Sequence, residues 1–140
     1  MVLTNIQTLP SFTIAAIPDS TIFSSEQLKK NKPVVVMLFN PDCEHCQRQT
    51  KELLAYKNEL KDIQIVMASS LSIKIIKEFY QDYNVASMPN VIMGQDINYA
   101  LRLKFRPTNF PAIYVYDAKG NLAKAFAGNV SVPAIIDAVK

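Results

Sequence analysis

The sequence is poor in several features on which common protein functions depend. Its 140 residues include 3 glycines, one histidine, two cysteines and no tryptophan. The scarcity of glycine argues against phosphate-binding loops, and neither a G-x-G-x-x-G motif nor a P-loop can be written in it. Fifteen basic and twelve acidic side chains leave a net charge of only +3, and the lysines are scattered among acids. A nucleic-acid partner therefore has no electrostatic support.

Long apolar runs are also missing. The longest, Val34 to Phe39, is far shorter than the roughly 20 residues that a membrane-spanning helix needs. The first residues show no charged segment followed by an apolar one, so no secretion signal is recognised in this chain. With 49% hydrophobic and 19% charged residues, the chain is too apolar for disorder. We expect a soluble globular protein with no membrane segment.

The chain is long enough to bury a hydrophobic core without disulfides or a structural metal. No repeat, low-complexity tract or linker interrupts it. We predict an N-terminal tail over residues 1–8, a single domain over residues 9–140, and a monomer.

Strand and helix signals alternate along the domain. Residues 34–39 are a continuous β-branched-rich run, which is typical of a central strand buried on both faces. Helical spacing of apolar residues follows it, with Asp42 as the expected N-cap. This order predicts an α/β domain with a mixed sheet covered by helices on both faces. The expected elements are strands at 11–16, 34–39, 63–69, 112–116 and 122–126, a helical turn at 24–30 with a capping box from Ser24 to Gln27, helices at 42–61 and 72–83, an amphipathic stretch at 96–103, and a last helix opened by Ser131 and Pro133.

The two cysteines form a single C-x-x-C motif, Cys43-Glu44-His45-Cys46. One close pair is not a disulfide framework, and it lacks the four ligands of a structural zinc site. The motif follows a buried strand and opens a helix, which is where α/β sheets usually bind ligands. This context favours redox chemistry over two incidental thiols.

The spacing itself suggests a mechanism. At the first helical position, unpaired backbone N–H groups and the helix dipole would favour the thiolate of Cys43. Cys46 lies one turn later and is expected to point inward. Because this separation brings two sulfurs within bonding reach, Cys43 can attack a substrate disulfide and Cys46 can resolve the mixed disulfide. We predict these two residues as the catalytic pair.

The chain resembles the thioredoxin superfamily, and more narrowly the thioredoxin-like thiol-disulfide oxidoreductases of the bacterial cell envelope, including those that reduce apocytochrome c. The resemblance covers nearly the whole chain. It rests on the strand at 33–39, the Cys43-Glu44-His45-Cys46 motif with its long helix, the stretch Asn109 to Asp117 with Lys119-Gly120, and Leu9 to Thr13, which is similar to the N-terminal extension of that group.

The resemblance implies a thioredoxin-like fold and a substrate groove. In this family the proline that matches Pro111 is cis and faces the C-x-x-C motif. The backbone of the preceding residue, here Phe110, pairs with the extended chain of the substrate. The implied partners are protein thiols or disulfides and a second redox protein that reloads the pair. The redox-active disulfide serves in place of a cofactor. The resemblance implies that the protein acts in the periplasm or cell envelope. The alternative location is the cytoplasm.

Three residues beside the thiols are expected to tune the pair. Asp42 and Glu44 place carboxylates near the thiolate and disfavour it, whereas His45, in the position where protein disulfide isomerase also has histidine, favours it. The buried acid that thioredoxins have six residues before the first cysteine is replaced by Met37. A different proton acceptor, such as Glu44 or water, is then needed. We expect the protein to act as a reductase. The alternatives are that it acts as an oxidase or as an isomerase.

Two other functions remain open at this stage. The two thiolates and His45 could hold zinc or Cu(I) as a metallochaperone does, although a second chain would have to complete the ligand set. Alternatively, the fold could serve as a non-catalytic binding domain, with Phe110, Met88, Met93 and the tyrosines as its recognition surface. We expect no metal site from this chain alone, and we expect these methionines in the core.

Overall fold

The fold is built on one mixed sheet. In the computed structural model, which describes residues 5–140, seven strands hydrogen-bond in the order β2-β1-β5-β4-β3-β6-β7. The strands are β1 (Thr13–Ala16), β2 (Thr21–Ser24), β3 (Val34–Leu38), β4 (Gln64–Ser69), β5 (Val91–Asp96), β6 (Ala112–Tyr116) and β7 (Leu122–Ala127).

Strand β3 is buried along its whole length, as its apolar run predicts. It pairs in parallel with β4 and antiparallel with β6. Because side chains alternate across a sheet, Val35 and Met37 enter one hydrophobic cluster and Val34, Val36 and Leu38 enter the other. The carboxyl end of β3 is thereby fixed between two covered faces.

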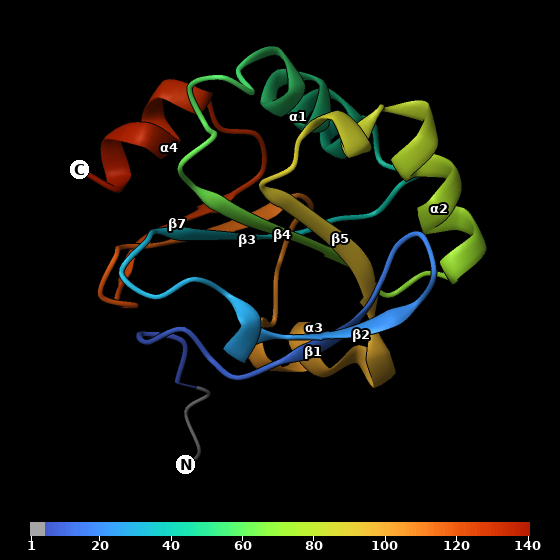
Figure 1. Cartoon of the computed structure of the whole chain (residues 1–140), viewed down its shortest axis with the longest axis horizontal. Helices are drawn as coiled ribbons and strands as arrows, with labels where there is room; N and C mark the ends of the chain where they lie inside the picture. Colours follow the sequence, from blue (N-terminus) through green and yellow to red (C-terminus); the bar gives the residue numbers. More distant parts are fainter. Residues whose placement is uncertain (1–4) are drawn as a thin grey trace.

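Helices cover both faces of the sheet, as predicted (Figure 1). One face packs on α1, α2 and α4 through one apolar cluster, and the other packs on α3 and the N-terminal segment. The helices are α1 (Glu44–Ala55), α2 (Ile73–Asp82), α3 (Ala100–Phe105) and α4 (Val132–Ala138), with short 3-10 turns η1 (Ser25–Gln27), η2 (Val85–Ser87) and η3 (Ile97–Tyr99).

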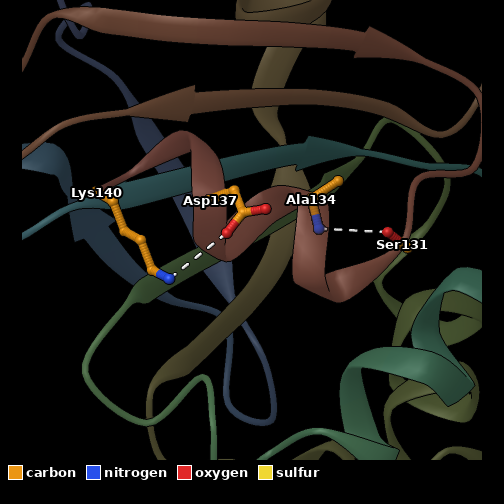
Figure 2. Close-up of polar contacts among 4 residues, drawn as sticks. All are labelled: Ser131, Ala134, Asp137 and Lys140. Atoms are coloured by element: carbon orange, nitrogen blue, oxygen red, sulfur yellow. Dashed lines mark hydrogen bonds and ion pairs between the residues drawn. The ribbon is translucent and has the colours of Figure 1, made fainter.

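Serine caps begin three of these elements. Ser24 forms the predicted capping box with Gln27, and Ser72 caps α2. At α4, the Ser131 hydroxyl accepts a hydrogen bond from the Ala134 N–H at 3.3 Å (Figure 2). These side chains satisfy N–H groups that the first helical turn cannot pair.

Two strands were not anticipated from the sequence. Strand β5 contains a glycine and two polar residues, and its pairing with β4 on one side and β1 on the other makes it a strand. The amphipathic stretch predicted at 96–103 is therefore partly wrong, since Asp96 ends β5 and helix α3 begins only at Ala100. Strand β2 pairs with β1 at the sheet edge.

Helix α1 is shorter than predicted. The expected helix to residue 61 is wrong, because α1 ends at Ala55 and turns follow it. Leu60 is buried at 1% exposure, and the Asn90 side chain donates to the carbonyl oxygens of Leu60 and Ile63 at 2.9 and 2.8 Å. These contacts fix the connection between α1 and β4.

The segment before β1 contacts the hairpin of β6 and β7. Thr8 forms a bridge with Asn121, the Leu9 N–H donates to Gly120 O at 2.9 Å, and the Tyr116 hydroxyl donates to Ile6 O at 2.7 Å. Residues 1–4 of the predicted tail lie outside the described residues, and the domain boundary at residue 9 stays a prediction. No helix within residues 5–140 has the length and apolar character to cross a membrane.

Gly94 is expected to be the least replaceable glycine. A Cβ at this position would lie 2.5 Å from the backbone oxygen of Ala15, where β1 pairs with β5 in the sheet. We expect Gly94→Ala to lower the free energy of unfolding by about 2–3 kcal/mol, because backbone must move to admit the methyl group. Chemical denaturation would measure this loss.

Gly128→Ala is the matched control. Its Cβ would meet nothing within 4 Å, and only its φ of +96° opposes a side chain, which costs about 1 kcal/mol. Equal losses for the two variants would contradict the proposed close approach of β1 to β5.

Candidate functional site

The C-x-x-C motif lies where the carboxyl end of β3 passes into α1. Cys43 is the N-cap residue, with an extended backbone at φ −93° and ψ 123°. Its side chain is half-buried, whereas Cys46 is completely buried in the apolar cluster below. The predicted contrast between an accessible first thiol and an inward second thiol is therefore present in the structure.

Asp42 does not cap the helix, so this prediction is wrong. The turn before α1 is held instead by Asn40, whose Oδ1 accepts the Asp42 N–H at 2.9 Å. Because Asp42 lies in this turn, the N-cap position moves to Cys43 and Glu44 becomes the first helical residue. The Cys43 side chain makes no capping hydrogen bond. Asp42 and Glu44 are both exposed beside the motif.

The two thiols, both free in this structure, have different surroundings. Burial raises the pKa of Cys46 to about 12, and the neighbouring Cys43 adds to this effect. The backbone N–H of Asn40, 3.5 Å from Cys46 Sγ, acts in the opposite direction. Cys46 therefore keeps its proton at neutral pH until a base removes it.

The loop before β6 approaches the first cysteine. The peptide bond between Phe110 and Pro111 is cis, as the resemblance implied. The Cys43 thiol donates to the Phe110 carbonyl oxygen at 3.8 Å. A residue 67 positions away in the sequence thus lies directly against the thiol that we expect to react.

Met37 occupies the place of the buried acid on β3. Its side chain is 1% exposed and belongs to the same apolar cluster as Cys46. A methionine cannot accept the proton of Cys46, so the acceptor has to reach the site from solvent or from the substrate.

His45 is exposed and points toward two polar partners. Its Nδ1 lies 2.7 Å from Arg48 Nη2 and 3.1 Å from Asn129 Oδ1. Arg48 can donate only to an unprotonated Nδ1, while Asn129 Oδ1 can accept only from a protonated one. The two contacts are therefore alternatives, and each goes with a different protonation of the ring nitrogen.

Side-chain hydrogen bonds connect α1 to the segment before α4 and to the first residue of α4. The Asn129 side chain donates to His45 O at 2.7 Å. The buried Gln49 pairs with both backbone groups of Val130, at 3.0 and 2.9 Å, and Glu52 accepts the Val132 N–H at 2.6 Å. Sequence reasoning missed these residues, because nothing local to α1 indicates which loop it will contact.

A small cavity adjoins the motif at the carboxyl ends of β3, β4 and β5. Its volume is about 40 Å³, which admits a few water molecules at most. Its lining includes Asn40, Phe110, Asp96 and Arg102. The last two were not predicted as site residues, although the position at strand ends is a general signal for binding.

The structure bears on the two alternative functions. Within residues 5–140, no group of three or more His, Cys, Asp or Glu side chains is arranged to hold a metal ion. Met88 and Met93 are 2% and 1% exposed. The expectation that these methionines lie in the core is confirmed, and they cannot form a recognition surface.

Comparisons with known proteins agree with this architecture. A family model described as a thioredoxin-like domain matches residues 25–140. Among solved structures, DsbF from Mycobacterium tuberculosis has 22% identity and a TM-score of 0.77, covering 99% of this chain and 96% of that one. A secreted disulfide oxidoreductase from the same organism, homologous to E. coli DsbE, has 19% identity and a TM-score of 0.71, with coverage of 86% and 85%.

StoA from Bacillus subtilis has 12% identity and a TM-score of 0.68, covering 94% of this chain and 98% of that one. No curated protein matches the sequence. Structural likeness at these identities shows the fold alone, and it confirms the predicted thioredoxin-like sheet with helices on both faces.

The different surroundings of the thiols predict selective alkylation. At pH 7, iodoacetamide should label Cys43 of the reduced protein and leave Cys46 unlabelled, because Cys46 is buried and its pKa is raised to about 12. Raising the pH to 9 should not change this selectivity, since Cys46 is still protonated there. Mass spectrometry of peptides would give the labelled site, with the urea-unfolded protein as the control in which both react. Comparable labelling of both cysteines in the folded protein would contradict this assignment.

Proposed function

Because this chain belongs to the thioredoxin-like domain family, we propose that it is a thiol-disulfide oxidoreductase that exchanges disulfides with protein substrates through Cys43 and Cys46. One observation carries the proposal. An accessible Cys43 lies at the start of α1 against the carbonyl of Phe110, with a buried, protonated Cys46 one turn below it. This is the arrangement that a nucleophile and a resolving thiol require.

The reaction proceeds in two exchanges. The Cys43 thiolate attacks one sulfur of a substrate disulfide, the substrate S–S bond breaks, and the released substrate sulfur takes up a proton. Cys46 then gives up its proton and attacks Cys43 Sγ, which breaks the mixed disulfide and releases the second substrate thiol. Two electrons pass from the Cys43–Cys46 dithiol to the substrate, and the pair is left as a disulfide that a partner protein reduces.

The resolving step has to wait for a base. Cys46 is protonated at neutral pH, and Met37 supplies no acceptor. The thiolate that leaves the substrate in the first exchange can take this proton, directly or through water. This order keeps Cys46 unreactive until a mixed disulfide has formed.

Phe110 and Pro111 form the substrate side of the site in this proposal. The Phe110 carbonyl already accepts from the Cys43 thiol at 3.8 Å. A substrate chain that lies extended along this loop would place its cysteine next to Cys43, with main-chain hydrogen bonds to Phe110.

The charges around Cys43 favour a reductase. The exposed carboxylates of Asp42 and Glu44 disfavour a thiolate and so favour the disulfide form of the protein, which makes the dithiol a better donor of electrons. A location in the cell envelope would suit this role, as the secreted relative suggests.

Single cysteine variants test the mechanism. Cys46→Ala should accumulate a mixed disulfide between Cys43 and a disulfide substrate, because no second thiol can resolve it. Cys43→Ala should lose exchange activity while retaining its fold. Non-reducing electrophoresis and mass spectrometry detect the trapped species, and circular dichroism checks the fold. Wild-type activity in Cys43→Ala, or a metal ion that co-purifies stoichiometrically and protects both thiols, would refute the redox mechanism.

A further inference from the structure

We propose that Arg102 forms a subsite for an acidic side chain of the substrate, next to the disulfide that reacts with Cys43. This inference rests on the proposed oxidoreductase function and names a substrate class for it. The substrate would be a protein or peptide that carries a glutamate or aspartate close to its reactive cysteine.

Arg102 lies within reach of the reacting sulfur because both contact the same residue. The Arg102 guanidinium carbon lies over the Phe110 ring, 5.4 Å from the ring centroid. The carbonyl of that same Phe110 contacts the Cys43 thiol. A substrate chain that follows Phe110 toward Cys43 therefore passes the guanidinium within a residue or two of its cysteine.

The Arg102 charge is available to a ligand. The side chain is exposed, and among residues 5–140 the only ion pair joins Lys140 and Asp137, far from the site. The guanidinium carbon lies over the Phe110 ring and both residues line the cavity, so this cation–π contact restricts the Arg102 side chain. A guanidinium fixed in this way loses little further freedom when it binds a carboxylate through two hydrogen bonds.

Asp96 is the acidic group of the cavity, and its hydrogen bonds are directed elsewhere. It is 4% exposed and accepts from the backbone N–H groups of Leu101 and Arg102 at 2.7 and 2.9 Å, and from the Ser70 hydroxyl at 3.4 Å. Asp96 thus positions the start of α3, and with it Arg102. Asp96 is therefore occupied in holding α3, whereas the Arg102 guanidinium, which also lines the cavity, carries N–H donors that suit a carboxylate.

The surrounding charges reinforce this preference. Arg102 places a cation on the α3 side of the site, whereas Asp42 and Glu44 place two exposed carboxylates beside Cys43 at the start of α1. A substrate with an acid toward α3 matches this pattern, and the same acid on the α1 side would be repelled. The cavity itself, at about 40 Å³, is too small to bind a whole side chain.

Paired peptides test the subsite. Two cyclic disulfide peptides would differ only in a glutamate or a glutamine next to the reactive cysteine. Acid quenching at timed intervals, followed by mass spectrometry, would give their rate constants for oxidising the reduced protein at low ionic strength. We expect the wild-type protein to react about two- to fivefold faster with the glutamate peptide, the range of an exposed ion pair. In Arg102→Gln this ratio should fall to about one or below.

Arg106→Gln is the matched control, because it removes the same charge from the C-cap of α3, outside the cavity lining. It should keep most of the wild-type ratio. A ratio near one in the wild-type protein, or equal falls in Arg102→Gln and Arg106→Gln, would overturn the subsite while exchange itself continued. Absence of exchange with both peptides and with glutathione would overturn the proposed function, and the subsite with it.

Discussion

Burial of β3 on both faces is the constraint from which the geometry of the site follows. The strand lies between β4 and β6, and its alternating side chains enter both apolar clusters. Its carboxyl end has no freedom to shift along the sheet, because a slip by one residue would exchange the two faces. Asn40 and the turn after it therefore begin from a fixed point, and Cys43 follows three residues later. The antiparallel partner β6 is fixed in the same way, so Phe110, just before it, reaches the same edge of the sheet.

Two different physical effects then act on the motif. Burial controls Cys46, because the same apolar cluster that stabilises the sheet raises the pKa of this thiol. Polar contacts hold the N-terminal half of α1, where hydrogen bonds of the Gln49 and Asn129 side chains connect the helix to the segment before α4. Stability and reactivity are therefore coupled at this end of the sheet. Met37 lies at the position on β3 where an acid could have accepted the Cys46 proton, so proton transfer is left to the reacting partners.

Charge is distributed unevenly around the first thiol. Asp42 and Glu44 lie on the α1 side, and Arg102 lies on the α3 side with its guanidinium over the Phe110 ring. The net charge of the chain, +3, gives no hint of this local separation. A carboxylate in the substrate would be attracted on one side of the groove and repelled on the other, so the site can select both a sequence and a chain direction. In this proposal, substrate specificity depends on where the fold places a few charged side chains and not on how many there are.

Local patterns in the sequence were sufficient for the buried strand at Val34–Leu38, the C-x-x-C motif after it, the serine caps and the last hairpin, since each depends on residues a few positions apart. The same patterns misplaced the N-cap at Asp42, extended α1 past Ala55 and missed β5, where pairing and packing with distant segments outweighed local preference. Contacts such as His45 with Asn129, 84 positions apart, or Arg102 with Phe110 were decided only by the tertiary structure. The physical reason is that periodicity specifies which face of an element is buried, whereas the partner of an individual polar group depends on how two remote elements pack together.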